Sequence, residues 1–304
     1  GRTIKVMNDI DLSSICGENV NGKEVSWKPI GFRTLDSENA EDDYIWFKGT
    51  FNGQYKHINN LYINTDEYEY AGLFCYNAGT IKNLLMDNVY IYIDYSESPH
   101  AADWHNNIGA LVGYNEGNIE SVGINSGSIT NINTVKSNYN HRTQAVGGIA
   151  GYNSSNISNS YNSTKIYVKN SEKSNDSPDA YNQVGGISGF VMGSIINCYN
   201  TGSIEAFNGK LNAVGGIVGD MYKGQAINCY NYGVMSGTGT YSNFNLIAGI
   251  VGRNGHNSEN KGTITNSYYT GESAIYSSYY NSTSNYYTTG KVTEETLKGY
   301  ASTL

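Results

Sequence analysis

The chain has 304 residues, of which 15% are charged, and a formal net charge of -8 at pH 7. Its Lys and Arg residues are scattered singly, which argues against a nucleic-acid partner, because phosphate binding needs a basic surface. No apolar run approaches the ~20 residues of a membrane-spanning helix. With 36 glycines, 28 tyrosines and 3 prolines, the composition is typical of a polar, exported β protein.

Residues 1–70 differ from the rest of the chain and are expected to start the fold. They contain short apolar runs around Ile10, Phe47 and Ile58, separated by Asn, Asp and Gly. An acidic run extends from Asp36 to Asp43 but lacks the spaced Asp-x-Asp-x-Asp-Gly order of a calcium loop. We therefore expect a solvated loop there, and no metal site.

From residue 71 to residue 253 a phrase of the type Gly-Gly-Ile-x-Gly-Tyr occurs six times. Its third residue, which we expect to point inward, is in turn Leu73, Leu111, Ile149, Ile187, Ile217 and Ile250. The spacing between these residues is 38 three times, then 30 and then 33. A repeat of this kind indicates stacked structural units rather than one globular core.

Each repeat contains two further short runs. The first begins with a second apolar position, at Ile81, Ile119, Ile157, Ile195, Ala226 and Ile264. Two residues later stand Asn83, Ser121, Asn159, Asn197, Asn228 and Asn266. The other run is of the type Gly202-Ser203-Ile204. Short runs cut by Gly and Asn, without a sustained helical period, favour strands. Three strands per repeat predict an all-β fold, a three-sided parallel β-solenoid, which the usual crossover preference makes right-handed.

We expect one solenoid domain over residues 1–304. It would consist of N-terminal coils over 1–70, six repeats over 71–271, and a C-terminal coil over 272–304 that ends in a short capping helix. Thr293 is the expected N-cap of that helix. Such a cap would cover a strand edge that otherwise invites pairing with another copy.

Stacked repeats also predict ladders of like residues. Four tyrosines share one column, at Tyr161, Tyr199, Tyr230 and Tyr268. The residues after the first three, Asn162, Asn200 and Asn231, are expected to hydrogen-bond along the axis. Cys198 and Cys229 share another column and are expected to be small, partly buried fillers rather than a disulfide. No Cys-x-x-Cys pair is present, so the sequence gives no reason to expect a zinc site.

Catalytic motifs are not recognisable. None of the five histidines is followed by Glu, which excludes a His-Glu-x-x-His metallopeptidase helix in this chain. The phrase around Ser188 resembles a nucleophile elbow only superficially, because other repeats carry Ala, Val or Phe there. Carboxylates that could pair as in a glycosidase lie on two connections, at Asp94, Glu97 and Asp103 and at Glu172, Asp176 and Asp179. Solvated loops are the better expectation, and we expect no enzyme activity and no cofactor.

Longer connections precede five of the glycine phrases, at 94–107, 131–145, 170–183, 205–213 and 236–247. Stacking would place them on one side of the rod, where insertions often form a binding face. Their rings and polar groups suit stacking on sugars or docking on a protein surface. The candidate ligand-binding residues are Trp104, His105, Tyr139, His141, Arg142 and Tyr181. The alternative is that these side chains fold back over the edge of the coil.

The N-terminal series followed by repeated Gly-Leu/Ile-x-Gly phrases resembles the GLUG-repeat family of bacterial surface and secreted proteins. The resemblance covers about residues 4–290. The chain departs from the family at Asn52, where Asp is common, and at Ala71 and Cys75, which replace glycines. This family includes adhesin-like proteins and non-catalytic parts of IgA-cleaving zinc peptidases, so the resemblance implies an exported bacterial β-solenoid.

The expected function is non-catalytic adhesion or ligand presentation outside a bacterial cell or on its surface. The expected partner is a host glycan or glycoprotein, extracellular matrix or an immunoglobulin. One alternative is an accessory, substrate-positioning segment of a secreted metallopeptidase directed at IgA or mucin. Another is a carbohydrate-active β-helix enzyme.

Overall fold

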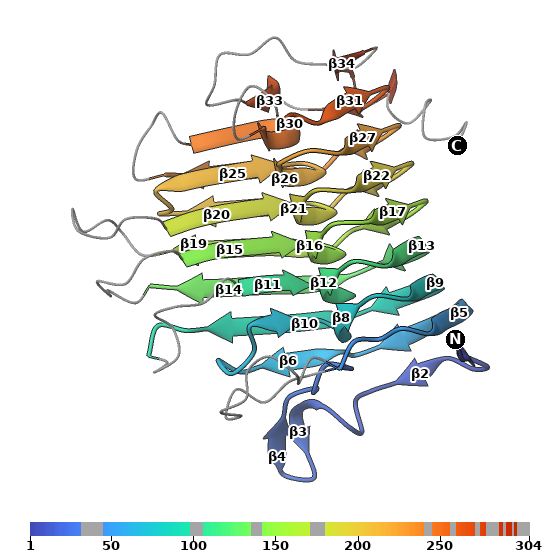
Figure 1. The fold of residues 1–304 in the computed structure, drawn as a ribbon. Coiled ribbons are helices and arrows are strands. Elements are labelled where there is room, and N and C mark those ends of the chain that lie inside the picture. Colours follow the sequence, from blue (N-terminus) through green and yellow to red (C-terminus); the bar gives the residue numbers. More distant parts are fainter. Residues whose placement is uncertain are drawn as a thin grey trace.

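The protein is a stack of short β-strands wound into coils along one axis, with the N-terminal coils at the bottom of Figure 1. The computed structural model describes residues 1–31, 45–97, 106–134, 142–170, 180–239, 245–255, 260–270, 274–277, 286–287, 290–293 and 295–296. Within these residues every strand pairing is parallel, except in one hairpin, β3 (Gly17–Val20) with β4 (Lys23–Val25). The predicted all-β parallel solenoid is confirmed.

Three parallel sheets form the sides of the solenoid. The first sheet has 15 strands: β1 (Thr3–Lys5), β2 (Ile10–Asp11), β5 (Thr50–Asn59), β9 (Thr80–Asp87), β13 (Asn118–Ile124), β17 (Asn156–Ser158), β18 (Tyr161–Asn162), β22 (Ser194–Ile196), β23 (Tyr199–Asn200), β27 (Gln225–Ile227), β28 (Tyr230–Asn231), β31 (Thr263–Thr265), β32 (Tyr268–Tyr269), β34 (Tyr286–Tyr287) and β35 (Gly290–Lys291). The second has 6: β6 (Tyr62–Asn64), β10 (Val89–Asp94), β14 (Gly127–Asn133), β19 (Lys165–Asn170), β24 (Ile204–Phe207) and β29 (Met235–Thr238). The third has 12: β7 (Tyr70–Ala71), β8 (Phe74–Asn77), β11 (Asn106–Gly109), β12 (Val112–Asn115), β15 (Arg142–Gly147), β16 (Ala150–Asn153), β20 (Ala180–Gly185), β21 (Ser188–Val191), β25 (Leu211–Gly215), β26 (Val218–Met221), β30 (Asn245–Asn254) and β33 (Ala274–Ser277).

The core consists of apolar columns that run along the solenoid axis. The third residue of the repeated phrase is buried in all six copies, as is the second apolar position of each repeat. In-register pairing places like residues next to one another, for example Ile119 beside Ile157 and Ile157 beside Ile195. The predicted inward column is therefore confirmed, and the second apolar position of each repeat forms another buried column.

The first sheet is bent at one position in every repeat. Asn83, Asn159, Asn197, Asn228, Asn266 and also Ser121 have φ values between 46° and 54°. This left-handed conformation is unfavourable for most residues but is tolerated by Asn. The recurring Asn of the sequence is thus a backbone requirement of the bend.

The residue after the bend bonds back to the chain just before it. Ser160 Oγ donates to the carbonyl of Ser158 at 2.7 Å, and Cys198 Sγ donates to that of Ile196 at 3.3 Å. Both Cys198 and Cys229 are fully buried free thiols. The prediction of small fillers without a disulfide is confirmed, although their burial is complete rather than partial. Ser160 and Cys198 make the same kind of bond at this position.

The predicted ladders of like residues are present. Asn162 Nδ2 donates to Asn200 Oδ1 at 2.9 Å, and Asn200 Nδ2 donates to Asn231 Oδ1 at 3.0 Å. The rings of Tyr161 and Tyr199 stack with centroids 4.8 Å apart. These contacts connect successive coils in addition to the backbone pairing.

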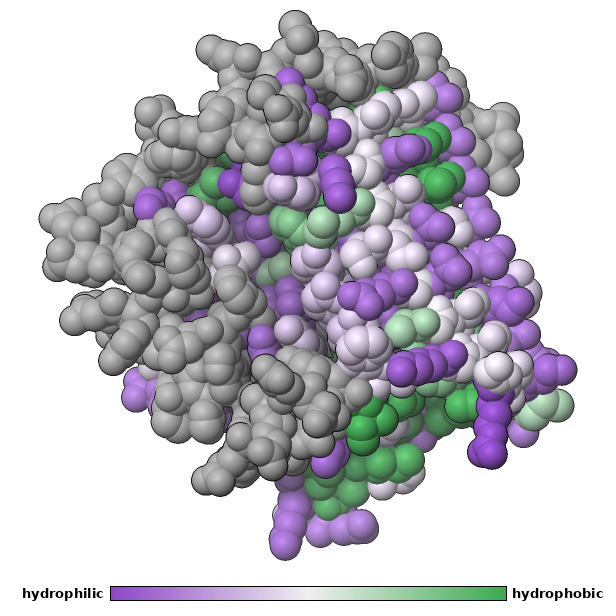
Figure 2. Space-filling model, viewed as in Figure 1, coloured by the Kyte–Doolittle hydropathy of each residue, from purple (hydrophilic) through white to green (hydrophobic). Residues whose placement is uncertain are grey.

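Among the described residues, two apolar side chains at the N-terminal end of the core are exposed. Ile4 and Ile10 continue the columns of Phe51 and Ile58, yet they are 51% and 37% exposed. Figure 2 shows apolar residues gathered at this end of the molecule.

At the C-terminal end, residues 295–296 are helical and Thr293 Oγ1 accepts a bond from Thr296 N at 3.2 Å, as an N-cap does. The extent of the capping helix lies outside the described residues, and the domain boundaries and the handedness of the coil stay predictions.

Replacing Ser121 tests the requirement for a left-handed bend. Ser121→Val places a β-branched residue at a φ of 54°, which should cost about 1–2 kcal/mol. Ser121→Asn restores the residue of the other copies and should stabilise the protein. Urea unfolding followed by circular dichroism measures both changes. Thr130→Val, on an ordinary position of β14, is the control, and an equal loss of stability in both valine variants would contradict the explanation.

Candidate functional site

Most residues of the predicted binding face lie outside the described part of the chain. These are Trp104, His105, Tyr139 and His141. Arg142 begins β15, where its backbone pairs with Ala180, and its side chain is likewise outside the description. Tyr181 is half-buried in β20, in register with Thr143 and Leu211. The structure thus places Arg142 and Tyr181 on neighbouring strands, one position apart.

Of the carboxylates considered for glycosidase chemistry, the described residues include Asp94 and Glu97. Asp94 ends β10, and its Oδ1 accepts a bond from Ser96 N at 2.9 Å. The Tyr92 hydroxyl donates to the other oxygen at 3.4 Å. Asp94 therefore has a local structural role in the turn that follows β10.

A cleft of about 430 Å³ opens near the N-terminal end. It lies between the turn after β2, the start of the β3–β4 hairpin, and the bends that join the first sheet to the second. Its lining residues are Ser13, Cys16, Gly17, Glu18, Asn19, Asn60, Leu61, Tyr62, Asn88 and Tyr90. None of these was among the six candidates predicted from the sequence.

Two successive bends of similar sequence form one wall of the cleft. Asn60 and Asn88 have φ values of 62° and 51°, and each turns the chain from the first sheet into the second. The amide of Asn88 donates to Asn60 Oδ1 at 2.6 Å. Beyond the bends, Tyr62 and Tyr90 are paired in register, and Tyr62 is buried whereas Tyr90 is exposed.

The two tyrosines are parallel rings with centroids 4.9 Å apart. The Tyr62 hydroxyl donates to Glu24 Oε1 at 2.6 Å, and Asn64 Nδ2 donates to the same oxygen at 2.5 Å. Burial and the bond to Glu24 raise the pKa of Tyr62 to about 12. The bond from Tyr62, followed by that from Asn64, lowers the pKa of Glu24. Glu24 is therefore an ionised acceptor at neutral pH and is not tuned as a general acid, which would need a raised pKa.

The charge in and around the cleft is negative. Its described lining includes the carboxylate of Glu18 and has no Lys, Arg or His. Burial, followed by the negative charges of Glu18 and Glu24, raises the pKa of Tyr90. Because like charges repel, the site disfavours anionic ligands and suits hydroxyl, amide or cationic groups.

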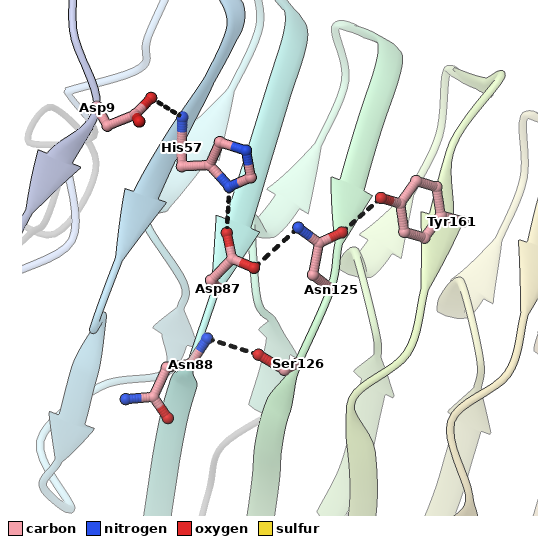
Figure 3. Close-up of polar contacts among 7 residues, drawn as sticks. All are labelled: Asp9, His57, Asp87, Asn88, Asn125, Ser126 and Tyr161. Atoms are coloured by element: carbon pink, nitrogen blue, oxygen red, sulfur yellow. Dashed lines mark hydrogen bonds and ion pairs between the residues drawn. The ribbon is translucent and has the colours of Figure 1, made fainter.

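A polar ladder adjoins this wall on the outside of the first sheet (Figure 3). The backbone N–H of His57 donates to Asp9 Oδ1 at 2.9 Å, and its Nδ1 lies 2.5 Å from Asp87 Oδ2. Asn125 Nδ2 donates to Asp87 Oδ1 at 2.9 Å, and the Tyr161 hydroxyl donates to Asn125 Oδ1. The contacts join successive coils through side chains that are partly exposed.

This ladder helps to position the cleft. Asp87 directly precedes the bend residue Asn88, and the backbone N–H of Asn88 donates to Ser126 Oγ at 2.9 Å. Figure 3 shows the contact of Asp87 with Asn125 and that of Asn88 with Ser126, each between neighbouring coils. The ladder therefore fixes one bend of the cleft wall from the side facing away from the N-terminus.

A second aromatic ladder lies on the third sheet. Neighbouring rings stack at centroid distances of 4.2 to 5.0 Å, in the order Trp46, Tyr76, Tyr114, Tyr152 and Phe190. Lys48 Nζ lies 5.1 Å from the centroid of the Trp46 ring. Because the rings cover one another's faces, this ladder stabilises the stack and offers ligands mainly ring edges. It is therefore a poorer sugar platform than the cleft.

Sequence reasoning missed the cleft because it depended on the glycine phrase, which residues 1–70 lack. A signal was present in the similar runs Ile58–Tyr62 and Met86–Tyr90, each an apolar residue, Asn or Asp, Asn, an apolar residue and Tyr. The second aromatic ladder could have been found as well, since four of its rings are the sixth residue of the repeated phrase.

Comparisons with known proteins agree with this architecture. The family model "The GLUG motif" matches residues 143–167 and 180–205. No curated protein matches the chain. A crystal structure from Bacteroides ovatus, described as a "putative immunoglobulin A1 protease", is 18% identical and aligns with a TM-score of 0.59. The alignment covers 99% of this chain and 80% of that one. At this identity the likeness shows the fold. In the described residues no helix has the length and apolar character needed to span a membrane.

The bond between Glu24 and Tyr62 predicts a dependence of stability on acid. The folded-state pKa of Glu24 lies below its ordinary value of 4.5, so its contribution is present above that pH and is lost as the pH falls through the folded-state value. Glu24→Gln should lower the melting temperature at pH 7, and the difference from the wild type should shrink towards pH 3. Melting curves over this range measure it, and a difference that does not vary with pH would contradict the assignment.

Proposed function

The chain is a GLUG-repeat protein, and we propose that it is a non-catalytic extracellular module of a bacterial surface or secreted protein that binds a glycan in the N-terminal cleft. One observation carries the proposal, namely a concave site of about 430 Å³ that joins stacked tyrosines to amide side chains. Sites for small ligands have volumes in this range and combine apolar surface with a few placed polar groups.

The chemistry of the lining suits a sugar. Tyr90 is 36% exposed, and the position next to it on β14 is the small residue Ser128 rather than another ring. Tyr90 lines the cleft and keeps an exposed ring surface besides the face that Tyr62 covers. An aromatic face packs against the C–H groups of a pyranose, while the side chains of Asn19 and Asn88 bond its hydroxyls.

Non-catalytic binding is favoured over hydrolysis by the state of Glu24, the carboxylate that bonds the tyrosine wall of the cleft. A glycosidase needs one carboxyl group held protonated by a raised pKa and a second carboxylate opposite it. Glu24 has a lowered pKa and is occupied by Tyr62 and Asn64. These contacts support a role in holding the tyrosine wall.

A second candidate function is substrate positioning for a peptidase that acts on immunoglobulin A. It is favoured by the likeness of fold to the Bacteroides ovatus protein described above. In that case the glycan bound by the cleft would be carried by the immunoglobulin. Mucin and immunoglobulin A therefore belong among the probes.

The test is binding of the wild type to a host-glycan array, purified mucin and immunoglobulin A, with Tyr90→Ala alongside. Removing the ring should weaken binding up to about tenfold, because aromatic contacts contribute about 0.5–1.5 kcal/mol beyond area burial. Tyr199→Ala is the matched control. Tyr199 is 40% exposed and stacks on Tyr161 at 4.8 Å, but it lies outside the cleft. Equal weakening by both variants would contradict a role for the cleft.

A further inference from the structure

An amide ladder runs inside the solenoid where the strands of the third sheet begin. Gln144 Nε2 donates to Asn182 Oδ1 at 3.3 Å, and Asn182 Nδ2 donates to Asn212 Oδ1 at 2.6 Å. Asn212 Nδ2 continues to Asn245 Oδ1 at 3.2 Å. Each of these amides belongs to the next coil, so the ladder follows the axis.

The same amides connect the third sheet to the second across the interior. Gln144 Nε2 also donates to the carbonyl of Lys169 at 3.4 Å, and Asn182 Nδ2 to that of Phe207 at 3.0 Å. Asn245 Nδ2 donates to the carbonyl of Gly237 at 3.1 Å. Direct bonds of this kind close the corner between the two sheets from Gln144 onwards.

The ladder stops between Gln144 and its register partner Asn106. Gln144 Oε1 and both amide atoms of Asn106 are buried and have no hydrogen-bond partner. The same is true of both amide atoms of Asn131 and of Asn133. Buried amides in folded proteins are bonded in nearly every case, so four such residues in one region call for a partner.

These four residues line one part of the interior. Gln144 bonds the carbonyl of Lys169, and Lys169 pairs in register with Ile132. Asn131 and Asn133 flank Ile132, and alternation along β14 directs both of them inward, as their burial shows. The amides of β14 therefore face the place where the ladder stops.

Asn131 is also out of keeping with its own column. Its register partners are Ile93 and Val168, both fully buried. A valine would fit this apolar column without leaving an amide unbonded. The amide at this coil has a physical reason only if something polar is bound to it.

The unbonded atoms identify the chemistry of that ligand. They comprise four carbonyl oxygens, from Asn106, Asn131, Asn133 and Gln144, and three NH₂ groups, from the asparagines. A cation would satisfy the oxygens alone, whereas water both donates and accepts. We propose that Asn106, Asn131, Asn133 and Gln144 form an internal hydration site, in which ordered water replaces the direct amide bonds between the second and third sheets.

The site would extend the ladder by one coil towards the N-terminus. Asn106 opens β11 and Asn133 closes β14, so both stand at the sheet corner that the ladder bridges elsewhere by direct contact. Buried water molecules bond polar groups that would otherwise be unsatisfied and are costly to remove. Hydrogen bonds thus connect the second and third sheets along the whole corner, through amide side chains from Gln144 onwards and through water at Asn106.

The first test is a crystal structure of the wild-type chain at a resolution that shows ordered water. We expect water within hydrogen-bond distance of at least three of the four amides. Amides bonded only to one another or to other protein groups would overturn the proposal. A soak with thallium(I) distinguishes water from a monovalent cation, and an anomalous peak among the four oxygens would also overturn it.

Stability measurements give an independent result. Asn131→Val introduces the residue that its register partner Val168 has on β19. If the amide of Asn131 binds nothing, this variant should be more stable than the wild type. Bound water predicts the opposite, because valine removes one of its partners. We expect the melting temperature to fall by about 2–4 °C, while Thr130→Val on the outer side of the same strand leaves it nearly unchanged. A rise, or no change, for Asn131→Val would overturn the proposal.

Discussion

The rest of the structure depends on parallel, in-register pairing between successive coils. This pairing places each residue beside its equivalent in the next repeat, at the spacing of adjacent strands. Apolar residues then merge into continuous columns, and rings and amides become ladders. A coil can close in this register only if the chain bends at the same point each time. The left-handed residues from Asn83 to Asn266 supply that bend in the first sheet. The glycines of the repeated phrase are explained by close approach of the backbones, since a Cβ at Gly151 would lie 2.3 Å from Ile108 N.

The same constraint separates stabilising aromatic residues from a candidate binding surface. A ring inside a ladder has neighbours on both faces, as Tyr114 has in Tyr76 and Tyr152. A ligand can stack on a ring only at the end of a ladder, where one face of the last ring is not covered by another ring. Tyr90 is such a ring, because the next position in its column is Ser128. Aromatic content alone is therefore a poor guide to binding in this fold, and the end of a column is a better one.

Repetition also decides how much could be predicted from the sequence. The three sheets, the buried columns of Ile149 and Ile157, and the Asn162 ladder follow from spacing alone, because each repeat confirms the others. The prediction of three strands per repeat was wrong, since bends divide one repeat into the five strands β15 to β19. The cleft could not be found in this way, since the hairpin that forms one of its sides occurs once. The site residues predicted on the connections rested on the position of insertions, and most of them lie outside the described residues. The break at Asn106 was also beyond sequence reasoning, because Asn106 and Gln144 occupy equivalent positions and the pattern predicts a bond between them.

Uniform columns create a problem of their own, because a coil of isoleucines pairs equally well with several others. Directed polar contacts remove this ambiguity, as a single buried Asn does when it fixes the register of a coiled coil. Asn131 lies between Ile93 and Val168 and so distinguishes its coil from both neighbours. Near the other end, the ring ladder after Phe190 gives way to a buried Asp220 that bonds Arg253 and Gln183. Shifting a strand by one repeat would place Arg253 against a ring and leave the Asp220 carboxylate buried without its cation, which is far more costly than any misplaced isoleucine. The polar exceptions within the repeats therefore specify which coil stacks on which.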